Sequence, residues 1–173
     1  MVKGKPQRGI FMKSVAVMGL GNFGTALAYN WISAGHDVRG WTVEQEVFDS
    51  INTKGINEKY LSDVNLDGFS VSMNIAETID GAEIVVLALP SAVILDVVDD
   101  ILPHLHSEQV LLDLAKGLAP GDQMISAAIN SKLRTAGLSD GAYTSETPTD
   151  GQPLAIAAGS SAVVVATTRQ ILR

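Results

Sequence analysis

The clearest chemical pattern in this chain is the turn Gly19-Leu20-Gly21-Asn22-Phe23-Gly24, which follows the apolar run 14–18. Glycines at this spacing between a strand and a helix are typical of dinucleotide binding. Gly19 permits a tight turn, Gly21 lets backbone amides approach a pyrophosphate, and Gly24 lets the helix pack closely on the strand. The anion would lie at the positive end of the helix. The turn therefore predicts a site for two linked phosphates.

Two alternatives to dinucleotide binding can be weighed from the same residues. A glycine-rich turn can simply connect a strand to a helix, and the turn alone leaves that interpretation open. The context favours binding, because the strand, the turn, the helix and a second strand follow one another at the spacing of a βαβ unit. A P-loop is excluded, because Gly24 is followed by Thr25 and no lysine is present there to reach β and γ phosphates.

The end of the second predicted strand bears on the choice between NAD and NADP. A carboxylate there accepts hydrogen bonds from the ribose 2′-hydroxyl, whereas an arginine pairs with a 2′-phosphate. The sequence reads Trp41-Thr42-Val43-Glu44-Gln45-Glu46, Glu44 stands 20 residues beyond Gly24, and no arginine follows the strand. This segment favours NAD and makes NADP the weaker candidate. Glu44 fits equally well as a solvated residue in the first turn of a helix, stabilised by the helix dipole.

Other candidates for chemistry lack partners at a useful spacing. The histidines have no partner carboxylate at ligand spacing, so we expect them to be solvated. Three aspartates of the segment 92–102 fall on the polar side of an amphipathic helix, which indicates a solvated face. We therefore expect no metal site. These residues are His36, His104, His106, Asp96, Asp99 and Asp100.

The composition excludes several classes of function. The chain has 173 residues and a net charge of −7, so its overall field repels nucleic acid and anionic membrane surfaces. Its apolar runs, such as 84–89, are far shorter than the ~20 residues that a membrane span needs. It has no cysteine, which excludes disulfides, a thiol nucleophile and cysteine-based zinc sites. A cysteine-free chain is compatible with a reducing cytoplasm, where we expect this protein.

Short apolar runs alternate with longer amphipathic segments from residue 14 onward. This alternation predicts repeated βαβ units and a Rossmann-type, doubly wound, mostly parallel sheet with helices on both faces. Asn74 and Glu77 have the spacing of a capping box, and Gly81 would end the helix that they begin. The predicted strands are 14–18, 37–41, 69–73, 83–89 and 109–114, and the other predicted helices are 24–33, 92–102 and 122–136.

The two ends of the chain are expected to differ from this body. Residues 1–13 are interpreted as a flexible extension, and residues 14–173 as one dinucleotide-binding domain. Glycine, serine, threonine, aspartate and proline crowd the segment 135–153, which predicts a loop. Two further short strands are expected at 155–158 and 162–166, and Thr168 is a candidate cap for a last helix.

Several further motifs appear in a fixed order along the chain. Taken together with the glycine turn, they resemble NAD(P)-dependent glycerol-3-phosphate dehydrogenase over residues 14–166. The segment 41–46 resembles the NAD-using members of that family more than those that prefer NADP. The motifs are Trp41 at the end of its strand, Ile51-Asn52-Thr53, Lys59-Tyr60-Leu61, Leu89-Pro90 and Ala115-Lys116-Gly117-Leu118.

The resemblance implies hydride transfer between NAD(H) and glycerol 3-phosphate or dihydroxyacetone phosphate. Lys116 would reach both the cofactor and the substrate, and a cation at this position is suited to stabilise the developing alkoxide. Lys116, Thr147 and Thr149 are the expected substrate-binding residues. The expected cofactor-binding residues are Gly19, Gly21, Asn22, Phe23, Gly24, Val43, Glu44, Tyr60, Pro90 and Lys116.

The chain departs from the family pattern in two places. The family has a Gly-Pro-Ser/Thr loop near the substrate, whereas this chain reads Thr147-Pro148-Thr149, with 151–155 as a rival alignment. The family also continues into a helical domain with the general acid/base lysine and most of the dimer interface. We therefore expect a fragment or truncated homologue that binds cofactor without turnover, and a homodimer only with that second domain. A non-catalytic dinucleotide-binding module and the cofactor domain of another hydroxyacid dehydrogenase remain alternatives.

Overall fold

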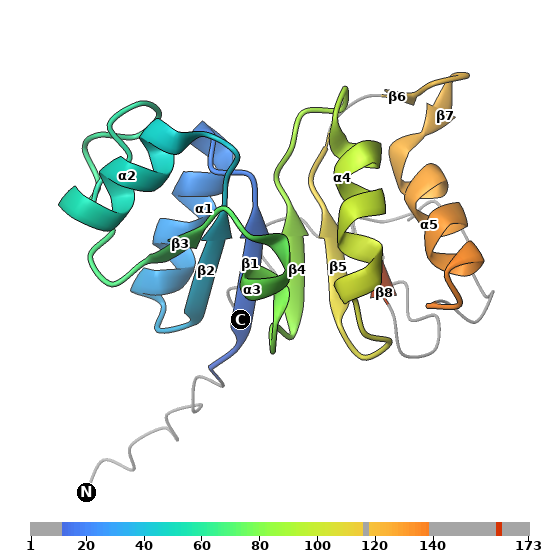
Figure 1. Ribbon diagram of the computed structural model, residues 1–173, viewed down its shortest axis with the longest axis horizontal. Helices are drawn as coiled ribbons and strands as arrows, with labels where there is room; N and C mark the ends of the chain where they lie inside the picture. The colour runs from blue at the N-terminus through green and yellow to red at the C-terminus, as the bar shows by residue number, and fades with distance from the viewer. Residues whose placement is uncertain (1–11, 116–117, 139–161, 164–173) are drawn as a thin grey trace, which may run out of the picture.

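The computed structural model describes residues 12–115, 118–138 and 162–163. Its body is a six-stranded sheet in the order β3-β2-β1-β4-β5-β8, and every neighbouring pair in it is parallel (Figure 1). A short antiparallel ribbon of β6 (Leu118–Ala119) and β7 (Gln123–Met124) stands apart from it. The strands of the large sheet are β1 (Ser14–Met18), β2 (Asp37–Trp41), β3 (Ser70–Ser72), β4 (Ile84–Leu87), β5 (Val110–Asp113) and β8 (Ala162–Val163).

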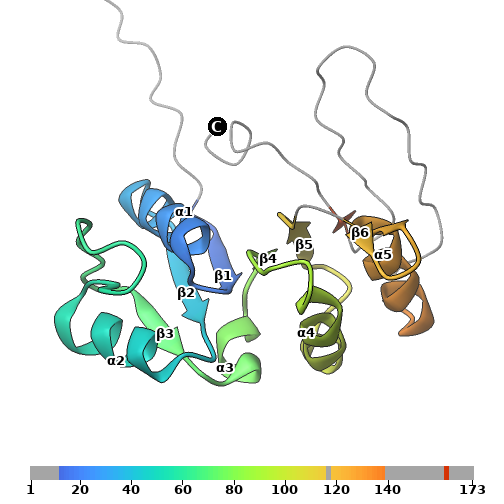
Figure 2. The same ribbon diagram turned by 90° about the horizontal axis from the view of Figure 1, so that it is seen from above.

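Helices cover both faces of the sheet (Figure 2). Side chains alternate along β1, so Val15 and Val17 join one apolar core while Ala16 and Met18 join the other. The first core contains residues of α1 and α2, and the second contains residues of α3, α4 and α5. The helices are α1 (Asn22–Ser33), α2 (Gln45–Lys54), α3 (Ile75–Ile79), α4 (Ile94–Ile101), the short 3₁₀ helix η1 (Leu102–His104) and α5 (Ile125–Thr135).

The strand order predicts a binding crevice at the carboxyl ends of the central strands. The chain runs outward from β1 to β2 and β3, and then returns to place β4 on the other side of β1. Met18 pairs with Trp41 on one side and with Leu87 on the other, so the carboxyl ends of these three strands are level. In open α/β sheets, ligands bind outside the carboxyl ends of the strands at such a switch point. The predicted doubly wound fold is confirmed, and it directs attention to the loops after β1, β2 and β4.

Most predicted elements are confirmed, with shifted ends. The strands 14–18 and 37–41 match, and the other three predicted strands are each shorter than expected. Asn74 caps α3 as expected, because its Oδ1 accepts a hydrogen bond from the Glu77 backbone N–H at 3.3 Å. The Glu77 carboxylate accepts instead from Ser72 Oγ, so the capping box is not reciprocal. Segment 92–102 is α-helical only over α4, and Pro103 lies in the 3₁₀ helix η1 that follows it directly.

Two predicted helix starts are wrong. The first helix begins at Asn22 rather than at residue 24, and this places Gly21 in the N-cap position. The helix expected over 122–136 begins only at Ile125, because Gln123–Met124 pairs with Leu118–Ala119 as an antiparallel ribbon. Gly121 and Asp122 turn that ribbon with φ angles of 79° and 58°. The ribbon was not predicted, and the helix that proves to be α2 was considered only as the alternative setting of Glu44.

The remaining expectations concern the ends of the chain. The first two residues of the strand expected over 162–166 form β8 beside β5. The segment 155–158, the helix at Thr168, and residues 1–11 of the expected extension lie outside the described residues, as does most of the expected loop over 135–153. Within the described ranges, no helix combines the length and the apolar character needed to cross a bilayer.

Candidate functional site

A cleft of about 470 Å³ opens at the carboxyl ends of β1, β2 and β4. The glycine turn forms one wall, the segment after β2 forms a second, and the segment after β4 forms a third. Nine residues predicted as cofactor-binding from separate segments of the sequence come together in its lining. They are Gly19, Gly21, Asn22, Phe23, Gly24, Val43, Glu44, Tyr60 and Pro90.

The three glycines of the turn are required for different reasons. Gly19 has a φ of +101°, and a Cβ there would lie 2.6 Å from the Ala88 carbonyl oxygen. A Cβ on Gly24 would lie 2.0 Å from the Gly19 carbonyl oxygen. Gly21 has an ordinary φ of −70°, and no described atom lies within 4 Å of the place where its Cβ would stand. The fold therefore requires glycine at 19 and 24, whereas the open space at Gly21 suits a group that enters the cleft.

Helix α1 presents its amino terminus to this open space. Gly21 is its N-cap, no side chain caps it, and its first turn contains no acidic residue. The first N–H groups of an α-helix have no partner within the helix and carry partial positive charge. The 12-residue α1 therefore offers backbone donors to an anion at the site of Gly21.

Exposed apolar side chains border the same cleft. Phe23 is 56% exposed, Val43 69% and Val93 43%, although all three are large hydrophobic residues. Ligand pockets combine such apolar surfaces with a few polar groups that fix orientation. The apolar rim suits flat rings at either end of a dinucleotide.

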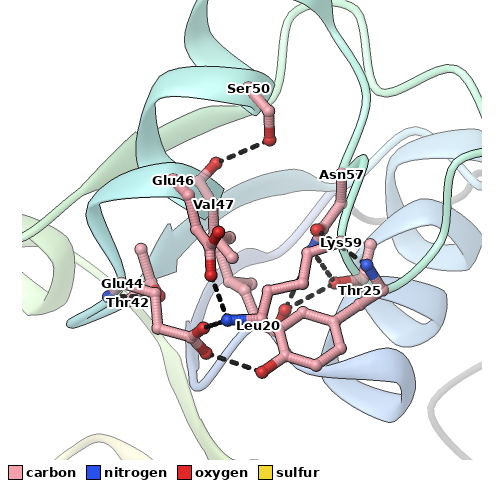
Figure 3. Close-up of polar contacts among 10 residues, drawn as sticks. Leu20, Thr25, Thr42, Glu44, Glu46, Val47, Ser50, Asn57 and Lys59 are labelled. Carbon is pink, nitrogen blue, oxygen red and sulfur yellow. Dashed lines mark hydrogen bonds and ion pairs between the residues drawn. The ribbon is translucent and has the colours of Figure 1, made fainter.

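Glu44 is the main charged residue of the cleft, and neighbouring side chains hold it in place (Figure 3). Its Oε1 accepts a hydrogen bond from the Tyr60 hydroxyl at 2.8 Å, and its Oε2 accepts one from the Lys59 ammonium, which also pairs with Glu46. The Lys59 hydrogen bond holds the pKa of Glu44 below its ordinary value, against the opposing effect of burial, and the Tyr60 hydroxyl adds to this lowering. Glu44 stands at the N-cap of α2, directly before its first turn, with its carboxylate hydrogen-bonded to Tyr60 and Lys59.

Lys59 and Asn57 are two residues of this site that the sequence analysis did not single out for a role. Asn57 is fully buried and hydrogen bonds to the glycine turn, and Lys59 binds the candidate ribose-binding carboxylate. Neither residue lies in a pattern of period or spacing that would have marked it. The motif Lys59-Tyr60-Leu61 was the only available signal, and it pointed to Tyr60.

The predicted substrate residues cannot be placed in the same way. Lys116, Thr147 and Thr149 lie outside the described residues, so their roles stay predictions. The chain before Lys116 is described: β5 ends at Asp113, whose Oδ1 accepts a hydrogen bond from the Ala115 backbone N–H at 2.9 Å. This contact shapes the chain at the same edge of the sheet as the cleft.

Asp113 yields a prediction about stability. It is only 5% exposed, and this burial raises its pKa above the ordinary value of 3.8, partly offset by the Ala115 hydrogen bond. An acid with a raised pKa binds protons more tightly in the folded chain, so its contribution to stability falls as the pH rises above that ordinary value. Asp113→Asn keeps an oxygen acceptor for Ala115 without the charge. We expect this variant to raise the melting temperature at pH 7 by about 2–4 °C, equivalent to about 1 kcal/mol.

Thermal melts of both proteins at pH 7 and pH 4 test this prediction. The advantage of the variant should shrink at the lower pH, where the wild-type carboxyl is protonated more often. A variant that melts below the wild type at pH 7 would contradict it.

Two of the residues considered for metal binding have other partners. His36 Nδ1 accepts a hydrogen bond from the Lys13 backbone N–H at 3.3 Å. Asp96, Asp99 and Asp100 are exposed on α4, as the pattern predicted, and Asp99 pairs with Lys132 at 2.6 Å. Among the described residues, no three histidine, aspartate or glutamate side chains gather in a way that could hold a metal ion.

Comparisons with known proteins agree with the geometry of the cleft. Residues 14–171 match the family model described as NAD-dependent glycerol-3-phosphate dehydrogenase N-terminus. A curated relative, glycerol-3-phosphate dehydrogenase [NAD(P)+] of Staphylococcus aureus, is 32% identical over 156 residues. That alignment covers 86% of this chain and 47% of the relative, so the chain spans about half the length of the curated relatives it matches.

Solved structures share the fold. The glycerol-3-phosphate dehydrogenase of Coxiella burnetii has a TM-score of 0.67 at 24% identity, over 70% of this chain and 38% of that one. The glycerol-3-phosphate dehydrogenase of Saccharomyces cerevisiae has a TM-score of 0.61 at 25% identity, over 70% of this chain and 39% of that one. The family match, and not the shared fold, distinguishes this chain from other dehydrogenases built on the same sheet. The chain belongs to the NAD-dependent glycerol-3-phosphate dehydrogenase family, and it comprises the amino-terminal NAD-binding domain.

Proposed function

We propose that the cleft binds NAD(H) with the pyrophosphate over Gly21, in a glycerol-3-phosphate dehydrogenase that interconverts glycerol 3-phosphate and dihydroxyacetone phosphate. The observation that carries the proposal is the open space at Gly21, where the fold itself would accept a side chain. The free amino terminus of α1 faces the same place and supplies donors for an anion. When bound, the nicotinamide ring supplies or accepts the hydride.

The other cleft residues divide by chemistry. Phe23, Val43 and Val93 supply apolar surface for the rings of the cofactor, and Asn22 adds a polar group beside the phosphates. Glu44, held ionised by its neighbours, is suited to accept hydrogen bonds from the adenosine ribose. Saturable binding of NADH by the 173-residue chain, followed by fluorescence, tests the proposal. A titration with no saturable change would contradict it.

The choice between the two dinucleotides depends on Glu44. Because its carboxylate stays ionised and lines the cleft, it would repel a ribose 2′-phosphate bound there. We expect NADH to bind about tenfold more tightly than NADPH, a difference of about 1.4 kcal/mol. Parallel fluorescence titrations with both cofactors measure this ratio.

Two single variants test the assignment of that preference. Glu44→Gln should bring the two dissociation constants close together, because the charge facing the 2′ position is removed. Glu46→Gln is the matched control, since Glu46 also pairs with Lys59 but does not line the cleft. Equal dissociation constants in the wild type would remove Glu44 from the account.

The substrate side of the proposal rests on the resemblance and on position. Lys116 follows β5 in the sequence, three residues after Asp113, and we propose that it contacts both the nicotinamide end of the cofactor and the substrate oxygen. Thr147 and Thr149 are proposed to contact the substrate. We also propose that the whole enzyme is a homodimer and acts in the cytoplasm. The curated relatives carry the name glycerol-3-phosphate dehydrogenase [NAD(P)+], which supports the assigned reaction.

A further inference from the structure

A buried asparagine joins two segments of the cleft that are far apart in the sequence. Asn57 has no exposed surface, and its Nδ2 donates to the Leu20 carbonyl oxygen and to Thr25 Oγ1, both at 2.9 Å (Figure 3). Its Oδ1 accepts from the Tyr60 backbone N–H at 3.2 Å. Thr25 is also fully buried and donates to the Leu20 carbonyl oxygen at 3.0 Å.

The first segment is the glycine turn. The Leu20 carbonyl is held from inside the protein by both Asn57 and Thr25. In a planar trans peptide the C=O and the following N–H point in opposite directions. With the Leu20 carbonyl fixed toward Asn57, the Gly21 N–H is directed away from Asn57. The asparagine thus sets the orientation of the peptide that the pyrophosphate is proposed to meet.

The second segment is the loop after α2. Asn57 holds the Tyr60 backbone through its side chain and the Leu61 N–H through its own carbonyl, at 2.9 Å. Tyr60 in turn donates its hydroxyl to Glu44 at 2.8 Å. An unbroken series of hydrogen bonds therefore runs from the glycine turn through Asn57 and Tyr60 to the carboxylate at the end of β2.

We propose that Asn57 is a positioning residue that couples the pyrophosphate end of the cofactor site to the adenosine-ribose end. This inference rests on the proposed binding of NAD(H) in the cleft. Asn57 lies below the cleft lining, so it acts through Leu20 and Tyr60 and not through direct contact. Without it, the loop that presents Tyr60 and Lys59 to Glu44 is no longer fixed relative to the turn.

A double-mutant cycle on NADH affinity tests the coupling in the 173-residue chain. Tyr60→Phe removes one hydrogen bond to Glu44, and in an otherwise wild-type chain we expect about fivefold weaker binding. Asn57→Asp has nearly the same shape, but it places an acceptor against the Leu20 carbonyl. In that background Tyr60→Phe should weaken binding by less than about twofold, because the two ends are no longer coupled. An undiminished fivefold effect would overturn the inference.

Matched variants separate this role from a general loss of stability. Asn52→Asp is the control, because the Asn52 Nδ2 donates to the Val71 carbonyl oxygen at 3.1 Å and the residue does not line the cleft. In that background the effect of Tyr60→Phe should remain about fivefold. A comparable loss of the effect in Asn52→Asp would count against a specific role for Asn57.

A second pair of variants serves if Asn57→Asp fails to fold. Thr25→Val removes the hydroxyl that Asn57 binds, and Thr25→Ser keeps it. The Tyr60→Phe effect should shrink in the valine variant and persist in the serine variant, and the reverse or an equal effect in both would overturn the inference. A wild-type chain that binds no NADH would instead overturn the proposed function, and the coupling with it.

Discussion

Replacing Gly21 with valine should weaken NADH binding about 100-fold, equivalent to about 3 kcal/mol, because a branched side chain would displace the pyrophosphate from two or more backbone donors. The fold should lose no more than about 1 kcal/mol, because the only cost is that valine is a poorer N-cap than glycine. Gly21 has a φ of −70°, which valine adopts readily, and no described atom stands within 4 Å of its Cβ position. Fluorescence titration with NADH measures the affinity, and a thermal melt without cofactor measures the stability.

The control for this variant adds a valine elsewhere on the same helix. Asn30 is exposed on α1 and does not line the cleft, so Asn30→Val should leave NADH affinity unchanged. If Gly21→Val binds NADH as tightly as the wild type, the pyrophosphate does not lie over this turn. If it loses binding only because it unfolds, the melt without cofactor will reveal that.

Replacing Gly24 with alanine should have the opposite profile, with a large loss of stability. Its Cβ would lie 2.0 Å from the Gly19 carbonyl oxygen and 3.2 Å from the Ala88 Cβ, so α1 would have to move away from the strand ends. Overpacking of this kind costs about 3 kcal/mol, which corresponds to a fall in melting temperature of about 6–12 °C. Calorimetry or a circular dichroism melt of the chain without cofactor measures the change.

Helix propensity alone predicts the opposite result for Gly24→Ala. Alanine in a helix is favoured over glycine by about 1 kcal/mol, so propensity alone would make Gly24→Ala more stable than the wild type. A stabilised variant would therefore show that the close approach of α1 to the Gly19 carbonyl is not what fixes this position. The two variants together separate a glycine that the ligand requires from a glycine that the fold requires.

Much of this architecture was predictable because the relevant signals are local. The strands at 14–18 and 37–41 are apolar runs bounded by turns, and burial on both sheet faces produces that pattern. The glycine turn was recognisable because its three glycines stand at a characteristic spacing between a strand and a helix. Val43, Tyr60 and Pro90 were predicted from separate segments of the sequence, and all three line the same cleft.

The errors and omissions arise where tertiary contacts decide. Gln123 and Met124 form a strand only because Leu118 and Ala119 pair with them, and no periodic pattern in four residues signals that. The position of Asn57 was invisible for the same reason, since its partners at Leu20 and Thr25 are 37 and 32 residues away in sequence. The hydrogen bond from Tyr60 to Glu44 likewise spans 16 residues.

The central claim is that the backbone at the start of α1 binds the cofactor's phosphates, and amide chemical shifts test it most directly. Two-dimensional ¹⁵N–¹H spectra of the 173-residue chain should be recorded during a titration with NADH. We predict large, saturable shifts for the amides of Gly21, Asn22, Phe23 and Gly24. Saturable shifts confined to the opposite edge of the sheet, around Gly81 and Glu83, with the glycine turn unchanged, would contradict the account.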